Sequence, residues 1–345
     1  MELNFSTSRL CLAHSWAISR TKASDTAEVV IIELDDRNGG KGLGEAAPVH
    51  RYDESTETVK DFLRSVDPKQ LSFQDLPGSL AYLESVAPGN RSAKCAVDVA
   101  LHDGASRKSR LPLHDFLGLQ FVEQRYLTSF SIGIDSPEVI QRKVAAAETY
   151  PVLKLKVGVA ADRAQLRALR EVAPDKPVRL DANEGWLTKE EALRAIERLA
   201  EDGNIQFVEQ PLPASTPVAD YAWLKQRSPL PIFADESFHS AADVIKVAEG
   251  FHGVNVKLVK TGGITRAVRA LQAARKAGLK TMIGCMIETS LLISAAAHLC
   301  ELCDYIDLDG NLLITNDPYA GVTAERGMLS FAGTAEPHGL RVRLR

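Results

Sequence analysis

The sequence predicts a TIM-type (β/α)8 barrel preceded by a smaller α+β domain. Short apolar runs alternate with amphipathic helical stretches from residue 126 onward, which is typical of a barrel with parallel strands. Several of the runs end in a charged residue, as strands do at the functional end of such a barrel. The eight runs centre near residues 128, 154, 179, 207, 233, 256, 283 and 306.

The first 124 residues predict a separate domain, because strands come first and helices follow. Residues 29–34 are β-branched and apolar, and Asn38, Gly39 and Gly40 form a turn before a second strand. Helical periodicity then covers residues 53–66 and 92–107. We expect the barrel to occupy residues 125–315, and residues 316–345 to pack back on the N-terminal domain.

Residues 152–158 predict the second barrel strand. Leucine and valine alternate with Lys154 and Lys156, so both lysines share one face. An edge strand with lysines in water is the alternative interpretation. Amphipathic helices are predicted between the strands at residues 162–172 and 188–200, the latter with Thr188 as its N-cap.

Composition narrows the class of protein. The chain has 345 residues and a formal net charge of −4, which argues against a nucleic-acid surface. No apolar run approaches the roughly 20 residues that span a bilayer. Five cysteines thinly spread, and no basic and apolar leader at the start, lead us to expect a reduced, cytoplasmic protein. Cys300 and Cys303 lie in a helical pattern without a second pair, so a zinc site is not expected.

Three carboxylates follow consecutive predicted strands. Asp181, Glu209 and Asp235 end the third, fourth and fifth apolar runs. Carboxylates directed at one space repel each other unless a cation joins them, and hard oxygen ligands suit Mg2+. Capping of the following helices is the alternative role, and it explains one such residue better than three in a row. The sequence therefore predicts a Mg2+ site.

Lysines are expected on both sides of this site. Lys154 and Lys156 lie on the second strand and Lys257 ends the sixth, and these strands face each other across an eight-stranded barrel. Amines that are partly buried beside a divalent cation should have depressed pKa values and can act as general bases. Lys260 is interpreted as a loop lysine in solvent, although a shifted register would exchange it with Lys257.

Seven short motifs occur in a fixed order along the chain. They are Gly44–Pro48 (GEAAP), Ala96–Asp103 (AVDVALHD), Lys154–Lys156 (KLK), Asp181–Trp186 (DANEGW), Glu209–Pro211 (EQP), Ala234–Ser237 (ADES) and Asn255–Gly263 (NVKLVKTGG). This ordered set resembles the enolase superfamily, within its muconate-lactonizing-enzyme-like subgroup and its dipeptide epimerases. The resemblance covers nearly the whole chain.

This resemblance implies roles for the charged residues. The three carboxylates would be Mg2+ ligands, and Mg2+ would stabilise the enediolate formed when a proton is removed next to a carboxylate. Lys156 and Lys257 would be the acid/base pair on opposite faces of the carbanion, with Lys154 beside the substrate carboxylate. Two bases on opposite faces imply racemisation or epimerisation.

The substrate is suggested by Asp307 and Asp309. Both follow the eighth strand on one face, where they could hold a free ammonium group, and the pair resembles the site that binds the N-terminus of a dipeptide. Residues 284–290, with Met286 and Glu288, also look like a substrate-binding segment of the family. The resemblance places specificity in loops near residues 15–24 and 49–54, where Arg20 could pair with a substrate carboxylate.

The leading hypothesis is a Mg2+-dependent epimerase that inverts the second residue of an L,L-dipeptide similar to L-Ala-L-Glu. N-acylamino-acid racemase, o-succinylbenzoate synthase and muconate-type cycloisomerase are alternatives with the same lysines and metal site, although their substrates lack a free ammonium. A ligand-binding or scaffold protein on a decayed barrel is a further alternative. We expect a small-molecule dipeptide partner and a homo-oligomer, and neither nucleic-acid nor membrane partners.

Overall fold

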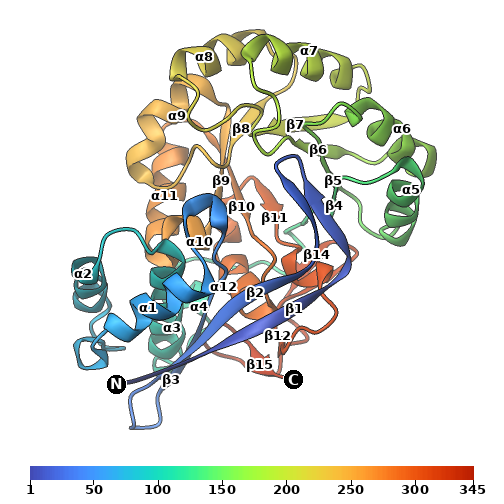
Figure 1. Ribbon diagram of the computed structural model, residues 1–345. Helices are drawn as coiled ribbons and strands as arrows, with labels where there is room; N and C mark the ends of the chain where they lie inside the picture. Colours follow the sequence, from blue (N-terminus) through green and yellow to red (C-terminus); the bar gives the residue numbers. More distant parts are fainter.

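A computed structural model describes residues 1–345, and its centre is an eight-stranded parallel barrel (Figure 1). The strands pair in chain order from β4 to β11, and a parallel bridge between Thr128 and Ile306 joins the two ends. The predicted barrel is therefore confirmed. Its strands are β4 (Phe130–Ile132), β5 (Leu153–Lys156), β6 (Val178–Asp181), β7 (Ile205–Glu209), β8 (Ile232–Ala234), β9 (Gly253–Lys257), β10 (Lys280–Gly284) and β11 (Tyr305–Asp307).

Helices cover the outside of the barrel and connect successive strands. The helix predicted at residues 162–172 is α6, and the Thr188 side chain caps α7 by accepting a hydrogen bond from the Glu191 backbone N–H, as predicted. The outer helices are α5 (Pro137–Ala146), α6 (Asp162–Val172), α7 (Lys189–Ala200), α8 (Val218–Arg227), α9 (Val244–Gly250), α10 (Leu258–Thr261), α11 (Ile264–Lys276) and α12 (Ser290–Ala297).

The N-terminal domain is an antiparallel sheet packed against helices. Its predicted strands are β2 (Thr21–Asp35) and β3 (Lys41–Ala46), and its helices are α1 (Thr56–Ser65), α2 (Leu76–Val86), α3 (Arg91–Lys108) and α4 (Leu113–Phe116). Sequence analysis did not predict β1 (Glu2–Ile18), which pairs with β2 along most of its length. The tip of this long β1–β2 ribbon reaches the mouth of the barrel (Figure 1), where the Ser19 hydroxyl donates to the Ala182 carbonyl.

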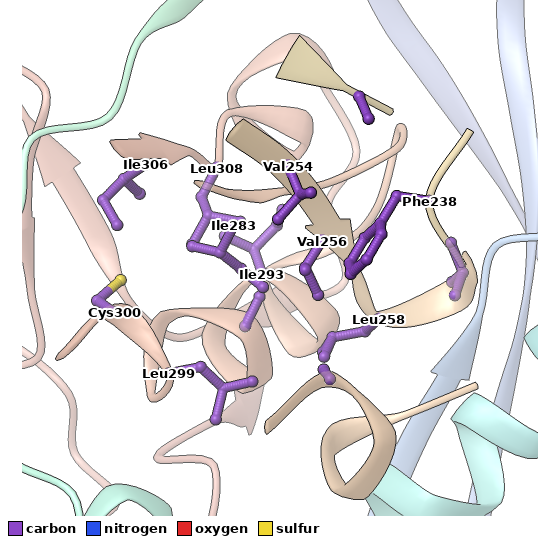
Figure 2. Close-up of a cluster of buried hydrophobic side chains, with 14 of the residues drawn as sticks. Phe238, Val254, Val256, Leu258, Ile283, Ile293, Leu299, Cys300, Ile306 and Leu308 are labelled. Carbon is purple, nitrogen blue, oxygen red and sulfur yellow. The ribbon is translucent and has the colours of Figure 1, made fainter. Parts of the chain in front are cut away.

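Two large hydrophobic cores stabilise the fold. The larger core comprises 65 buried residues, and Figure 2 shows the region in which Val254 and Val256 of β9 and Ile283 of β10 pack toward Ile293 of α12. The smaller core comprises 17 buried residues from the N-terminal sheet and the helices that cover it. Each valine or isoleucine buried in this way contributes roughly 1.5–3 kcal/mol.

The last thirty residues contact both parts of the molecule. The Leu340 backbone N–H donates to the Asp103 carboxylate of α3, and Met328 forms a bridge with Leu127 at the start of the barrel. Short strands complete the segment: β12 (Tyr319–Ala320), β13 (Thr323–Glu325), β14 (Met328–Ser330) and β15 (Arg343–Leu344). None of the helices combines the length and apolar character that crossing a membrane requires.

Candidate active site

Three carboxylates meet at the C-terminal end of neighbouring strands. Asp181 ends β6, Glu209 ends β7 and Asp235 follows β8, and one oxygen of each lies within 4.8 Å of the others. All three are almost completely buried. Burial, followed by repulsion from Asp181, raises the pKa of Glu209 to about 8. The three carboxylates therefore need a positive charge nearby, and their buried oxygen atoms are suitable ligands for a hard divalent cation such as Mg2+.

Lys154 lies among the carboxylates. Its Nζ atom is 3.0 Å from Asp181, 2.7 Å from Glu209 and 2.7 Å from Asp307. Burial alone would lower the pKa of Lys154, but these carboxylates outweigh burial and raise it well above the ordinary value. Lys154 is therefore a fixed positive charge at the centre of the site.

The other two lysines of the predicted set approach from different strands. Lys156 of β5 lies 2.7 Å from Asp181, and Lys257 of β9 lies 2.9 Å from Asp235. These strands are four positions apart in the barrel, so the two amines face each other across it. The pKa of Lys257 is raised, because Asp235 and Glu209 outweigh the effect of burial. The predicted depression of the lysine pKa values refers to a site that holds a divalent cation, and it stays a prediction. Among the protein's own groups, neighbouring carboxylates stabilise the charges of Lys154 and Lys257.

The interpretation of Lys260 as a lysine in solvent is wrong. Lys260 is 2% exposed and its ammonium group pairs with the Asp235 carboxylate. Its Nζ also donates to the carbonyl oxygens of Asn255 and Phe238, at 3.1 and 3.3 Å. The chain enters the short helix α10 directly after Lys257, and a separation of three residues on a helix brings both lysines to one side. Lys260 therefore holds the Asp235 carboxylate in place through a buried ion pair.

Asp307 and Asp309 are both buried, and the Lys154 ammonium group that contacts Asp181 and Glu209 also contacts Asp307. Asp307 accepts hydrogen bonds from Lys154 and from the Ser129 hydroxyl, at 2.7 and 2.6 Å. Asp309 accepts from the Ser131 backbone N–H at 2.6 Å and has no lysine or arginine partner. Burial, together with repulsion from Asp307, raises the pKa of Asp309 to about 6. Asp309 is thus the carboxylate of this pair that lacks a cation.

A cavity of about 520 Å³ connects these groups and is roofed by the N-terminal domain. Met286 lines it, and Lys257 Nζ lies 3.9 Å from the Met286 sulfur. Glu288 is buried outside the cavity lining, where it accepts the Met286 backbone N–H at 3.0 Å, and burial raises its pKa to about 7. Arg20 lines the cavity, and its guanidinium pairs with Glu236.

Several residues of the site were not singled out from the sequence. Asn255 donates to Glu209 at 2.7 Å, and its position two residues before Lys257 on β9 could have revealed it by strand periodicity. Glu236 lines the cavity and was quoted only as part of a motif. Trp16 lies 5.9 Å below the Lys156 ammonium, measured to the ring centroid, and only the path of β1 places it there.

Comparisons with known proteins agree with this geometry. Residues 8–118 match the family model described as mandelate racemase / muconate lactonizing enzyme, N-terminal domain, and residues 139–311 match the one described as enolase C-terminal domain-like. The chain is 62% identical over 345 residues to the L-Ala-D/L-amino acid epimerase of Pedosphaera parvula, covering 99% of both chains. It is 38% identical to the L-Ala-D/L-Glu epimerase of Bacteroides thetaiotaomicron, covering 96% of this chain and 85% of the relative.

A solved structure shares the fold over the same extent. The dipeptide epimerase of Enterococcus faecalis V583, in complex with Mg and the dipeptide L-Leu-L-Tyr, superposes with a TM-score of 0.89 at 30% identity. The match covers 99% of this chain and 98% of that one. The likeness therefore includes both the barrel and the domain that roofs it.

Proposed function

The chain belongs to the mandelate racemase / muconate lactonizing enzyme family, and on that premise we propose that it is a Mg2+-dependent dipeptide epimerase. It inverts the α-carbon of the second residue of L,L-dipeptides that begin with a small residue, such as L-Ala-L-Glu. The observation that carries the proposal is the placement of Lys156 and Lys257 on opposite sides of three buried carboxylates.

The reaction is a transfer of one proton between two faces of a carbon. A divalent cation held by Asp181, Glu209 and Asp235 would supply positive charge for the carboxylate that becomes a dianion. Such a cation would also offset the carboxylates that raise the pKa of Lys257. One lysine, in its neutral form, removes the α-proton from its face, and the other, charged, delivers a proton to the opposite face. Lys154 holds positive charge beside the substrate carboxylate.

The Asp307–Asp309 pair supports a dipeptide with a free N-terminus. Lys154 already pairs with Asp307, whereas burial and repulsion from Asp307 raise the pKa of Asp309, which forms no ion pair with a lysine or arginine. An ammonium group is the complement of this buried carboxylate. N-acylamino-acid racemase, o-succinylbenzoate synthase and cycloisomerase activities are less well supported, since their substrates bring no cation to Asp309.

The second side chain of the dipeptide would lie beneath the segments near residues 15–24 and 49–54, which contribute Trp16, Arg20 and Tyr52 to the cavity. Arg20 can reach a substrate carboxylate only by sharing its charge with Glu236. We therefore propose that an acidic second residue is accepted without being required. We also propose that the enzyme works as a homo-oligomer in the cytoplasm, where its five unpaired cysteines stay reduced.

The test is incubation of the protein with Mg2+ in D2O and a set of L,L-dipeptides, with mass spectrometry of the products. Turnover should add one deuterium at the second α-carbon and produce the L,D epimer. N-acetylated dipeptides provide the matched control, and they should react far more slowly. Equal rates on acetylated and free dipeptides would replace the dipeptide assignment with N-acylamino-acid racemisation, and no exchange in any compound would contradict catalysis.

A further inference from the structure

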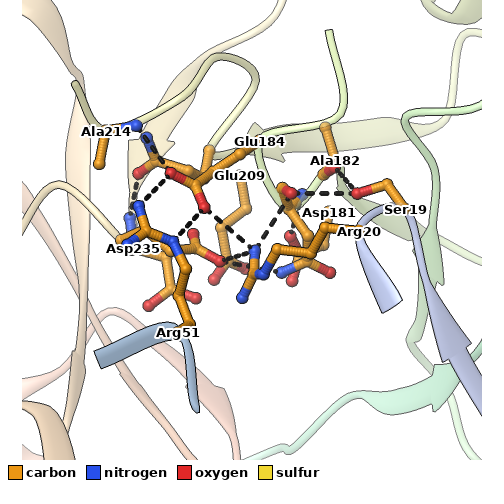
Figure 3. Close-up of polar contacts among 12 residues, drawn as sticks. Ser19, Arg20, Arg51, Asp181, Ala182, Glu184, Glu209, Ala214 and Asp235 are labelled. Atoms are coloured by element: carbon orange, nitrogen blue, oxygen red, sulfur yellow. Dashed lines mark hydrogen bonds and ion pairs between the residues drawn. The ribbon is translucent and has the colours of Figure 1, made fainter. Parts of the chain in front are cut away.

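One turn of the barrel is joined to both segments that roof the cavity. The turn follows Asp181, and its Glu184 carboxylate accepts two hydrogen bonds from Arg51, each of 2.8 Å (Figure 3). Glu184 also accepts the Ala214 backbone N–H at 2.7 Å, which fixes the carboxylate from the barrel side. Arg51 belongs to the second roof segment, and its paired guanidinium geometry is the strong form of this contact.

The first roof segment meets the same turn. Arg20 lies 3.4 Å from Glu184 and donates to the Asn183 carbonyl at 3.1 Å, while also pairing with Glu236. The neighbouring Ser19 hydroxyl donates to the carbonyl oxygens of Ala182 and Asn183, at 2.8 and 3.0 Å. Glu184 therefore stands between two arginines that come from separate segments of the N-terminal domain (Figure 3).

The backbone of the turn is held in an unusual conformation. Asn183 and Glu184 have positive φ angles of 43° and 67°, a region that few residues other than glycine adopt. Gly185 is packed against Gly158, and a β-carbon at Gly185 would lie 2.5 Å from the Gly158 α-carbon. Such conformations persist only where surrounding contacts enforce them, and they cluster at functional sites. Here the turn carries Asp181 at one end and the Glu184 carboxylate at the other.

We propose that Glu184 is a positioning residue that clamps both roof segments over the bound dipeptide, a role that rests on the proposed function. The clamp consists of Glu184 and Glu236 on the barrel and Arg20 and Arg51 on the N-terminal domain. The two negative charges of this clamp equal its two positive charges, so closure of the roof segments brings no net charge to the cavity. Because Glu184 is 8% exposed at its side chain, water screens these pairs less than ordinary surface pairs.

Kinetics distinguish a clamp from a chemical group. An open roof weakens binding of the substrate and the transition state equally, which raises KM and leaves kcat nearly unchanged. Glu184→Gln keeps the shape of the side chain and removes its charge. We expect KM for the preferred dipeptide to rise about 10-fold, which corresponds to the loss of one charge-assisted hydrogen-bonded contact. Arg51→Gln should raise KM by the same factor. The double variant should raise KM no further than either single variant, because all three variants remove the same Glu184–Arg51 interaction.

Asp202→Asn is the matched control. Asp202 also accepts two hydrogen bonds from one arginine, Arg170, at 2.7 and 2.6 Å, and its side chain is 9% exposed. It precedes β7 and so lies at the end of the barrel opposite the mouth. This variant should change the melting temperature as Glu184→Gln does, but it should leave KM unaltered.

Hydrogen–deuterium exchange of the substrate-free proteins tests the clamp without relying on the identity of the substrate. Peptides covering residues 15–24 and 49–54 should exchange faster in Glu184→Gln than in wild type, and at the wild-type rate in Asp202→Asn. Unchanged exchange and unchanged KM in Glu184→Gln would overturn the clamp, as would an equal rise in KM in Asp202→Asn. Failure of the proposed function would instead appear as no dipeptide turnover by wild type, whatever the exchange rates.

Discussion

Replacing Asp309 by asparagine tests how the enzyme binds the free N-terminus of its substrate. Asp309 is 3% exposed, and its carboxylate meets a backbone N–H but no lysine or arginine. Asparagine keeps the size of the side chain and can still accept the Ser131 N–H, so the fold should persist. The substitution therefore removes one negative charge and little else.

The pKa of Asp309 indicates the size of the effect. Its rise from 3.8 to about 6 means that the ionised form is disfavoured by roughly 3 kcal/mol in the free protein, at 1.36 kcal/mol per pKa unit. A bound ammonium group would restore at least part of this free energy. Truncation of one partner of a buried charge pair costs about 2–5 kcal/mol, so the two values agree. We expect kcat/KM for a free dipeptide to fall roughly 100-fold in Asp309→Asn.

The assay is a double cycle of wild type and Asp309→Asn against free and N-acetylated dipeptide. Acetylation should reduce kcat/KM strongly in wild type and only slightly in the variant, because the variant has already lost the charge that the ammonium group contacts. In wild type, kcat/KM for the free dipeptide should also fall as the pH drops through about 6, where Asp309 takes up a proton and loses its charge. The variant should lack this step. Equal turnover of both substrates by wild type would show that Asp309 does not bind the ammonium group.

Four further substitutions and one chelation experiment concern the charged groups around the carboxylates. Asp235→Asn should lower Mg2+ affinity at least tenfold by titration calorimetry, and EDTA should stop turnover until Mg2+ is restored; full activity in excess EDTA would contradict the metal site. Lys156→Ala and Lys257→Ala should each abolish epimerisation while leaving α-proton exchange from one epimer only, with opposite epimers in the two variants, since acid/base groups contribute about 10²–10⁴-fold; exchange of the same epimer in both would disprove the two faces. Lys260→Met should destabilise the protein by about 3–5 kcal/mol in urea unfolding, because it leaves the Asp235 charge with one buried partner fewer; an unchanged midpoint would show that Lys260 is dispensable for stability.

Periodicity and strand order explain why so much of the site could be predicted from the sequence. Alternation placed Lys154 and Lys156 on one face, and charged residues at the ends of consecutive apolar runs had to converge once those runs formed parallel strands. The three carboxylates and Lys257 therefore came together as predicted. Local capping likewise made the start of α7 at Thr188 predictable.

Contacts between distant segments could not be predicted in this way, because no periodic pattern connects them. Lys260 was placed in solvent, whereas the turn into α10 buries it against Asp235. The long strand β1 brings Trp16 to Lys156, across 140 residues of sequence, and the tip of its hairpin gives Arg20 a partner in Glu236. Strand periodicity also gives no way to distinguish Asp307 from Asp309, whereas in the structure only Asp307 accepts a hydrogen bond from Lys154.

The barrel, the order of its strands and the chemical types at their ends depend on local periodicity, so they could be predicted from the sequence. Which charges are already paired depends on distances between segments far apart in the chain, so this follows only from the folded structure. Lys154 neutralises Asp307 and leaves Asp309 without a cation, and Glu236 occupies Arg20. Those pairings leave Asp309 as the carboxylate that a substrate cation can satisfy, and they give Arg20 a partner within the protein.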